Sequence, residues 1–134
     1  MNREFKFRVW NKRTNQWVHG PGYEVNLFGE MILLGGFMMG ISLDDLNHCV
    51  VLQYTGVKDK NNKEVYEGDI IQCIDLNYLI EWNDYQGKWV ARCPYYRQYH
   101  HPTLEHFLEI KSCIVIGNIM ENPELINDET NSSL

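Results

Sequence analysis

The stretch from Gln53 to Ile71, QYTGVKDKNNKEVYEGDII, decides the fold. It alternates short runs rich in Val, Ile and Tyr, which favour strands, with polar runs that are typical of turns. The polar turn over Lys58 to Lys63 separates a predicted strand over Cys49 to Tyr54 from a short return strand at Val65 and Tyr66. The stretch therefore predicts short antiparallel strands that follow one another closely.

The same pattern extends over most of the chain. The other predicted strands lie at residues 4–10, 17–18, 23–28, 70–75, 78–82, 89–93 and 113–119. Two short helical segments are predicted at residues 103–109 and 123–126. We expect a mainly β fold, a small and strongly bent antiparallel barrel or sandwich with one or two short helices. A single domain over residues 1–126 and a disordered tail over residues 127–134 complete the prediction.

The charge balance is acidic overall and basic at the beginning of the chain. Twelve Lys and Arg against eighteen Asp and Glu give a net charge of -6, which works against non-specific attraction to nucleic acid. The basic residues of the first hairpin are Arg3, Lys6, Arg8, Lys12 and Arg13. Their ordinary explanation is a charged edge strand that resists aggregation, and the alternative is contact with phosphates.

The cysteines and the apolar segments predict the compartment. Cys49, Cys73, Cys93 and Cys113 form no CxxC pair, and we expect no signal peptide before the first strand. We therefore expect free thiols in a reducing cytosol, packed as small hydrophobic side chains. The apolar run over residues 31–41 is too short to span a bilayer and contains glycines. It predicts a buried strand, with a surface for self-association as the alternative.

Three blocks of the chain resemble the YopX family, small proteins that recur in phages and prophages of Gram-positive bacteria and have no assigned activity. The blocks are REFKFRVW at residues 3–10, QYTGVKDKNNKEVYEGDII at 53–71 and IVIGNIMENPEL at 114–125. The resemblance implies a phage or prophage origin and no particular chemistry. The motif residues are Tyr54, Thr55, Gly56, Asp59, Tyr66, Glu67, Gly68, Asp69, Gly117, Asn118, Asn122 and Pro123. We expect them to be structural, because Gly permits tight turns and Asp and Asn bond to the backbone there.

Catalytic and metal sites have weak support in the sequence. A hard cation could be held by the carboxylates Glu67, Asp69, Glu121 and Glu124. Zinc could be held by Cys93, His100, His101, His106 and Cys113, although their spacing matches no familiar zinc site. The chain has no phosphate-binding loop, dinucleotide fingerprint or nucleophile elbow. We therefore expect a protein that is not an enzyme and binds no metal and no cofactor.

The segment CPYYRQYHHP, residues 93–102, concentrates side chains that are common in binding sites. Tyr and Arg dominate the energetics of many protein interfaces, and both stack on unpaired bases. The predicted binding residues are Tyr95, Tyr96, Arg97, Tyr99, His100 and His101. The ordinary explanation is that these tyrosines cover one end of the barrel.

We predict a cytoplasmic binding module that contacts a host or phage protein, does not act at a membrane, and can also self-associate. The alternative is a nucleic-acid accessory protein that uses the basic hairpin and the tyrosines.

Overall fold

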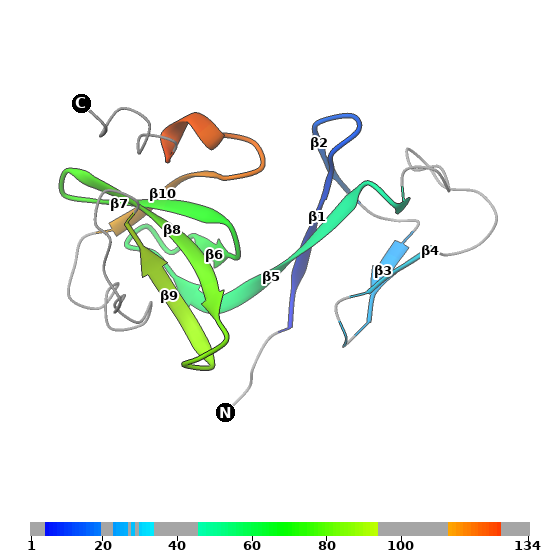
Figure 1. Cartoon of the computed structure of the whole chain (residues 1–134), viewed down its shortest axis with the longest axis horizontal. Helices are drawn as coiled ribbons and strands as arrows, with labels where there is room; N and C mark the ends of the chain where they lie inside the picture. Colours follow the sequence, from blue (N-terminus) through cyan, green and yellow to red (C-terminus); the bar gives the residue numbers. More distant parts are fainter. Residues whose placement is uncertain are drawn as a thin grey trace. The chain divides into compact units, whose positions relative to one another are not determined.

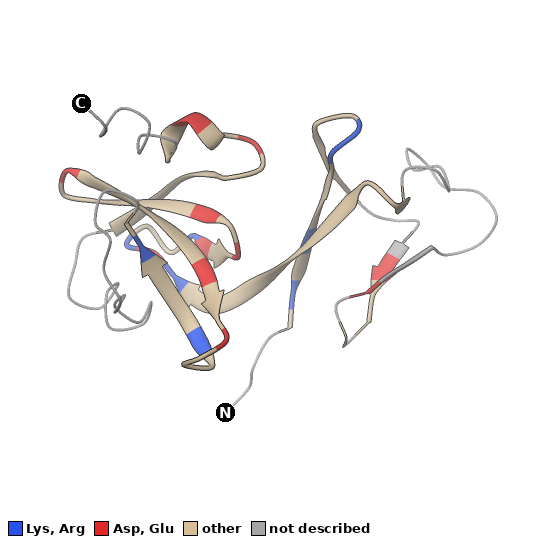
Figure 2. Ribbon diagram, in the orientation of Figure 1, with Lys and Arg blue, Asp and Glu red and all other residues tan. Residues whose placement is uncertain are grey.

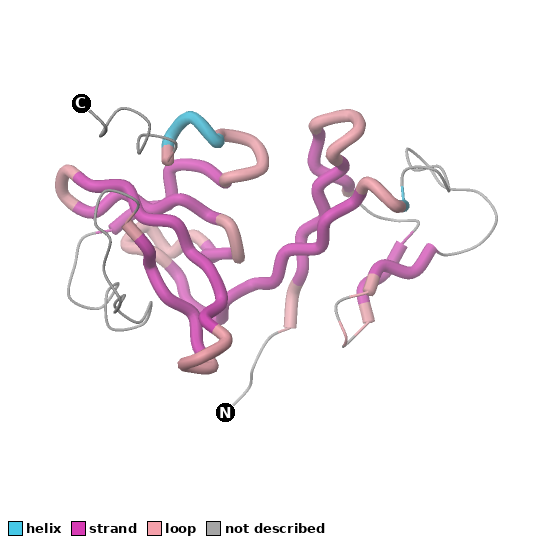
Figure 3. The backbone as a smooth tube through the Cα atoms, in the orientation of Figure 1, coloured by secondary structure: helices cyan, strands magenta, loops and turns pink. Residues whose placement is uncertain are grey.

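The structure, a computed structural model, describes residues 5–19, 23–26, 28, 30–33, 46–93 and 113–126. The chain divides into two compact units, Met1–Tyr54 and Thr55–Leu134. Strands make up almost all of the regular structure in both units (Figure 3). The tail over residues 127–134 lies outside the described residues, and the single domain over residues 1–126 stays a prediction.

The first unit contains a sheet and a separate hairpin (Figure 1). Its strands are β1 (Phe7–Asn11), β2 (Gln16–Val18), β3 (Tyr23–Val25), β4 (Met31–Leu33) and the first half of β5 (Cys49–Lys58). Strand β1 pairs antiparallel with β2 on one side and with β5 on the other. The register places Trp10 opposite Trp17, as the sequence predicts for this hairpin. Strands β3 and β4 pair with each other, so the apolar run begins as a strand, and its residues 34–41 lie outside the described part.

The second unit is built around a curved antiparallel sheet. Its elements are the end of β5, β6 (Glu64–Tyr66), β7 (Asp69–Cys73), β8 (Leu76–Asn83), β9 (Lys88–Arg92), β10 (Cys113–Asn118) and the 3-10 helix η1 (Pro123–Leu125). The strand order is β10-β7-β8-β9, so β7, β8 and β9 form a meander and β10 returns to pair with β7. The sheet curls into a half-barrel (Figure 1). The prediction of a mainly β, bent antiparallel fold with a short helix is confirmed, and the second predicted helix lies outside the described residues.

The core of the second unit follows the alternation of the strands. In β7, Ile71 and Cys73 point into the core, while Gln72 between them is exposed. The buried cluster consists of Val65, Ile71, Cys73, Ile80, Ala91 and Cys113. In the first unit, Val9 is fully buried, and Trp10, Leu52 and Tyr54 are nearly so. Each unit thus has its own buried apolar residues.

Two of the four cysteines form a disulfide. Cys73 and Cys113 lie opposite each other in β7 and β10, with Cα atoms 4.5 Å apart, and are joined by a disulfide. The expectation of free thiols is therefore wrong for these two residues and holds for Cys49 and Cys93. No local pattern indicates this pair, because the partners are 40 residues apart and meet only when β10 returns beside β7.

Candidate functional site

The corner between β6 and β7 is fixed by a buried carboxylate. Asp69 is 1% exposed, and its two oxygens accept hydrogen bonds from the Tyr66 backbone N–H at 2.7 Å and from Asn118 Nδ2 at 2.8 Å. Gly68 has a φ of 82°, which favours glycine, and its N–H donates to the carbonyl of Ile80. The Asp69 carboxylate is therefore committed to holding the corner and the end of β10.

Asn118 completes this network from the last strand. Its Nδ2 also donates to the Glu67 carbonyl at 3.3 Å, and its Oδ1 accepts the Met120 N–H at 2.9 Å. Asn122 Oδ1 in turn accepts the Asn118 N–H. A Cβ on Gly117 would lie 2.6 Å from Asn122 Oδ1, so this position requires glycine. Gly117, Asn118 and Asn122 thus pack closely together where β10 ends.

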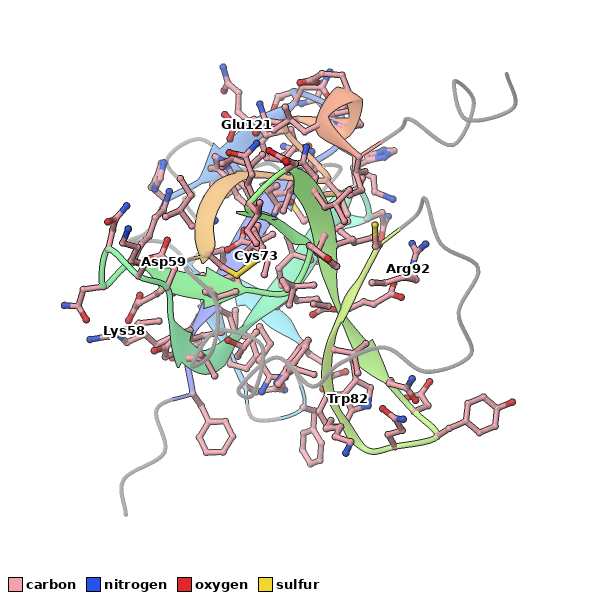
Figure 4. The ribbon with its side chains drawn as sticks, turned by 90° about the vertical axis from the view of Figure 1, so that its left-hand side faces the viewer. Lys58, Asp59, Cys73, Trp82, Arg92 and Glu121 are labelled. Carbon is pink, nitrogen blue, oxygen red and sulfur yellow. A yellow bond between two sulfur atoms is a disulfide. The ribbon has the colours of Figure 1, made fainter. Side chains whose placement is uncertain are left out.

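The turn between β5 and β6 is held by a second buried carboxylate. Asp59 Oδ1 accepts the N–H groups of Asn61 and Lys63, and its Oδ2 accepts the Val115 N–H at 2.8 Å. Thr55 Oγ1, near the beginning of this segment, donates to the Val65 carbonyl at 2.7 Å. Figure 4 shows Asp59 on its turn beside Lys58. Asp59 therefore fixes this turn, and Thr55 ties β5 to the neighbouring β6.

The described residues offer little support for the two predicted metal sites. The Asp69 carboxylate is used internally, and Glu121 and Glu124 are exposed at and before η1. Cys113 is in the disulfide and is no free thiolate for zinc, while His100, His101 and His106 lie outside the described residues. Within the described ranges, no group of three His, Cys, Asp or Glu side chains could hold a metal ion.

The basic residues of the first hairpin contact aromatic rings of their own sheet. The Arg8 guanidinium lies 3.6 Å from the centroid of the Trp17 ring, and Lys6 Nζ lies 5.6 Å from that of Tyr54. Lys12 and Arg13 lie in the exposed β1–β2 turn, and Arg3 is outside the described residues. Figure 2 shows these basic positions along β1 and its turn. The four described cations of the five predicted for phosphates therefore do not present one uniform basic face.

The β8–β9 hairpin presents exposed aromatic side chains. Trp82 is 46% exposed, and Tyr85 in the turn is completely exposed. The Trp82 and Trp89 rings form an edge-to-face pair with centroids 5.2 Å apart. Farther along the hairpin lies Arg92, which Figure 4 labels together with Trp82. Arg92 Nε donates to Glu81 Oε1 at 2.7 Å. Trp and Tyr are enriched among the residues that contribute most to binding at protein interfaces, so this hairpin is a candidate interaction site.

The sequence prediction missed this surface, although it predicted the hairpin. The available signal was a tyrosine in a polar turn between two tryptophans. The predicted binding residues, Tyr95 to His101, lie outside the described residues, and their assignment stays a prediction. They follow Arg92, the last residue of β9, by only a few positions.

The comparisons with known proteins place the chain in a family. The sequence profile described as "YopX protein" matches residues 6–127. The chain belongs to the YopX family. The resemblance predicted from the three sequence blocks is confirmed over most of the chain.

A solved structure shares the fold of this YopX-family protein. It is the crystal structure of protein EF1440 from Enterococcus faecalis, with a TM-score of 0.62 and 22% sequence identity, and the match covers 94% of this chain and 100% of that chain. No curated protein matches the sequence. In the described part of the chain, no helix has the length and apolar character needed to cross a membrane.

Proposed function

We propose that this YopX-family protein is a non-enzymatic binding module of phage or prophage origin whose partner is a host or phage protein in the cytoplasm. The observation that supports it is the exposure of Trp82 and Tyr85 on one hairpin. Trp and Tyr are the side chains most enriched at the energetic centres of protein interfaces. The motif residues, by contrast, are engaged in turns, and their contacts suggest no chemistry.

A nucleic-acid accessory role is the second candidate. Its support is the exposed β1–β2 turn with Lys12 and Arg13. The net charge of -6 and the contacts of Arg8 and Lys6 with aromatic rings argue against it. Binding through phosphates would weaken steeply with salt, whereas binding through apolar protein contacts would not.

The test is recovery of partners by tagged protein from a phage-carrying bacterial lysate, with and without nuclease. A specific protein should be recovered after nuclease treatment and lost with the variant Trp82→Ala/Tyr85→Ala. The variant Tyr96→Ala/Arg97→Ala tests the predicted neighbouring segment in the same assay. The matched control is Phe28→Ala, which removes another exposed aromatic side chain, from the first unit. Recovery that disappears with nuclease would refute the proposal and favour the second candidate.

A further inference from the structure

The two halves of β10 are anchored differently. The register of β10 against β7 shifts at a bulge between Val115 and Gly117. The half before the bulge contains Cys113, which is bonded to Cys73, a residue labelled in Figure 4. The half after the bulge contains Asn118 and the hydrogen-bond network described above. The disulfide therefore acts on the first half of β10 only.

The first half is also bound on its outer side, by the β5–β6 turn. The Cys113 carbonyl accepts the Lys60 N–H at 3.1 Å, and the Val115 N–H donates to Asp59 Oδ2 at 2.8 Å. Because these backbone groups face the turn, Cys113 and Cys73 form a pair without mutual backbone hydrogen bonds. Their Cα separation of 4.5 Å is typical of such a pair. The disulfide is therefore the direct link between the two strands at this position.

The fold can accommodate the reduced form of this pair. Cys113 is fully buried and Cys73 is 5% exposed, and both belong to the apolar cluster of the second unit. Two thiols in that cluster would pack as small hydrophobic side chains. Beyond the bulge, the Ile119 N–H donates to the Gly68 carbonyl at 2.8 Å, and neither this bond nor the Asn118 network involves sulfur. Reduction would therefore leave β10 attached through its second half.

The place of β10 in the sheet makes local opening possible. Among the described strands, β10 stands at one end of the order β10-β7-β8-β9. A short strand segment at the edge of a sheet can open without unfolding the rest of the domain. Such opening is needed for reduction, because both sulfurs belong to buried residues. In a reducing cytosol, disulfides are mostly transient or redox-sensing.

We propose that the Cys73–Cys113 disulfide is a redox switch that locks the first half of β10 when oxidised and releases it when reduced. In the release, the thiolate of a cellular thiol attacks one sulfur and the other leaves as a thiolate, which takes up a proton. A second thiol then displaces the first, so that two cysteine thiols and one disulfide of the reductant are formed. The two electrons and two protons come from the two reductant thiols, and the disulfide form of the reductant reverses the reaction.

This proposal goes beyond protein binding and rests on one part of the proposed function, the cytoplasmic location, which supplies the thiols. Its consequence is a sheet edge that opens under reducing conditions and closes under oxidising ones. An open β7 edge could accept another strand, whereas the locked edge could not.

The test is native-state hydrogen exchange of the full chain, with and without dithiothreitol. The reporters of the first half are the Lys60 and Val115 amides, and the references are the Gly68 and Ile119 amides. Reduction also lowers global stability, which speeds exchange at all four positions. We therefore expect exchange at the two reporters to increase at least about tenfold more than exchange at the two references, because only the reporters gain a local opening.

Two variants provide the controls. Cys73→Ala/Cys113→Ala should show the exchange pattern of the reduced protein and should not respond to dithiothreitol. Cys93→Ala leaves the disulfide intact and should respond as the wild type does. The comparison of the oxidised and reduced wild type needs no variant, so the test holds if the double variant does not fold.

The same reaction can be followed in cells that produce the protein. Thiols trapped by acid and alkylation should be found at Cys73 and Cys113 during growth, and the disulfide should form after treatment with the thiol oxidant diamide. A disulfide in both samples, or thiols in both, would overturn the proposal.

Three outcomes of the exchange experiment would also overturn it. Dithiothreitol might leave the disulfide intact in the native protein, or reduction might unfold the whole chain. Equal increases at the reporters and the references would mean that the disulfide stabilises the fold as a whole and releases no part of it. If partner recovery fails in both redox states while the local opening is observed, protein binding is refuted and the switch stands.

Discussion

Replacing Asn118 by Ala should destabilise the protein strongly. The side chain is 2% exposed and makes three hydrogen bonds: to the Asp69 carboxylate, to the Glu67 carbonyl and from the Met120 N–H. Alanine removes all three hydrogen bonds. The Asp69 carboxylate is itself buried, and its Oδ1 then loses the hydrogen bond from Asn118.

The size of the effect follows from these three bonds. The bonds to Glu67 and Met120 are between neutral groups, and each contributes about 1 kcal/mol. The bond to the buried Asp69 carboxylate contributes about 2 kcal/mol, because a charged acceptor is costly to leave unsatisfied. The sum of about 4 kcal/mol is a large part of the roughly 5–15 kcal/mol by which domains are stable.

Urea unfolding followed by tryptophan fluorescence and circular dichroism measures the change. The control is Asn61→Ala, because Asn61 is an exposed turn residue and only its backbone N–H bonds to Asp59. The control should change the free energy of unfolding by less than about 0.5 kcal/mol. If Asn118→Ala costs less than about 1 kcal/mol, the network does not hold β10, and the structural interpretation of the motif is wrong.

Three further changes test the fold. Cys73→Ala/Cys113→Ala should lower the free energy of unfolding by about 4 kcal/mol, because the disulfide closes a loop with a sequence separation of 40. A reductant should lower the urea midpoint of the wild type and leave that of the double variant unchanged. Ile74→Asn should raise the thermal midpoint and stabilise the fold by about 1 kcal/mol, because Ile74 is 75% exposed and its φ of 61° strains a β-branched residue more than Asn. An unchanged midpoint would show that the backbone at residue 74 is not strained. Gly117→Ala should lower the free energy of unfolding in urea by about 1–3 kcal/mol, because the added methyl group would clash with the Asn122 side chain. If the variant were as stable as the wild type, the Asn122 side chain would be shown to move aside at no cost.

Local pattern predicted the strands well. The predicted strand over residues 113–119 is β10, Cys113–Asn118, and the predicted helical turn over residues 123–126 is η1, Pro123–Leu125. Both succeed because alternation, Gly and Pro act over a few neighbouring residues. The NDYQG turn between Trp82 and Trp89 was predictable for the same reason.

The pairing of distant segments was not predictable in this way. Nothing near Cys73 or Cys113 shows that β10 returns to the edge of β7, so the disulfide and the Asp69–Asn118 contact were missed. The exposure of Trp82 was missed for a related reason. Whether a strand aromatic is covered depends on which side chains reach it from elsewhere, as Arg8 reaches Trp17 in the first hairpin.

The return of β10 also sets an order of events during synthesis of the chain. The carboxylates of Asp59 and Asp69 both receive a bond from β10, through the Val115 N–H and the Asn118 side chain. Until residues 113–118 have been made, these carboxylates lack those donors and the β7 edge has no β10 to pair with. The β7–β9 meander can therefore form before β10, and the sheet is completed only when residues 113–118 have been synthesised. A chain released before Asn118 would expose an unpaired strand edge, which is a template for aggregation.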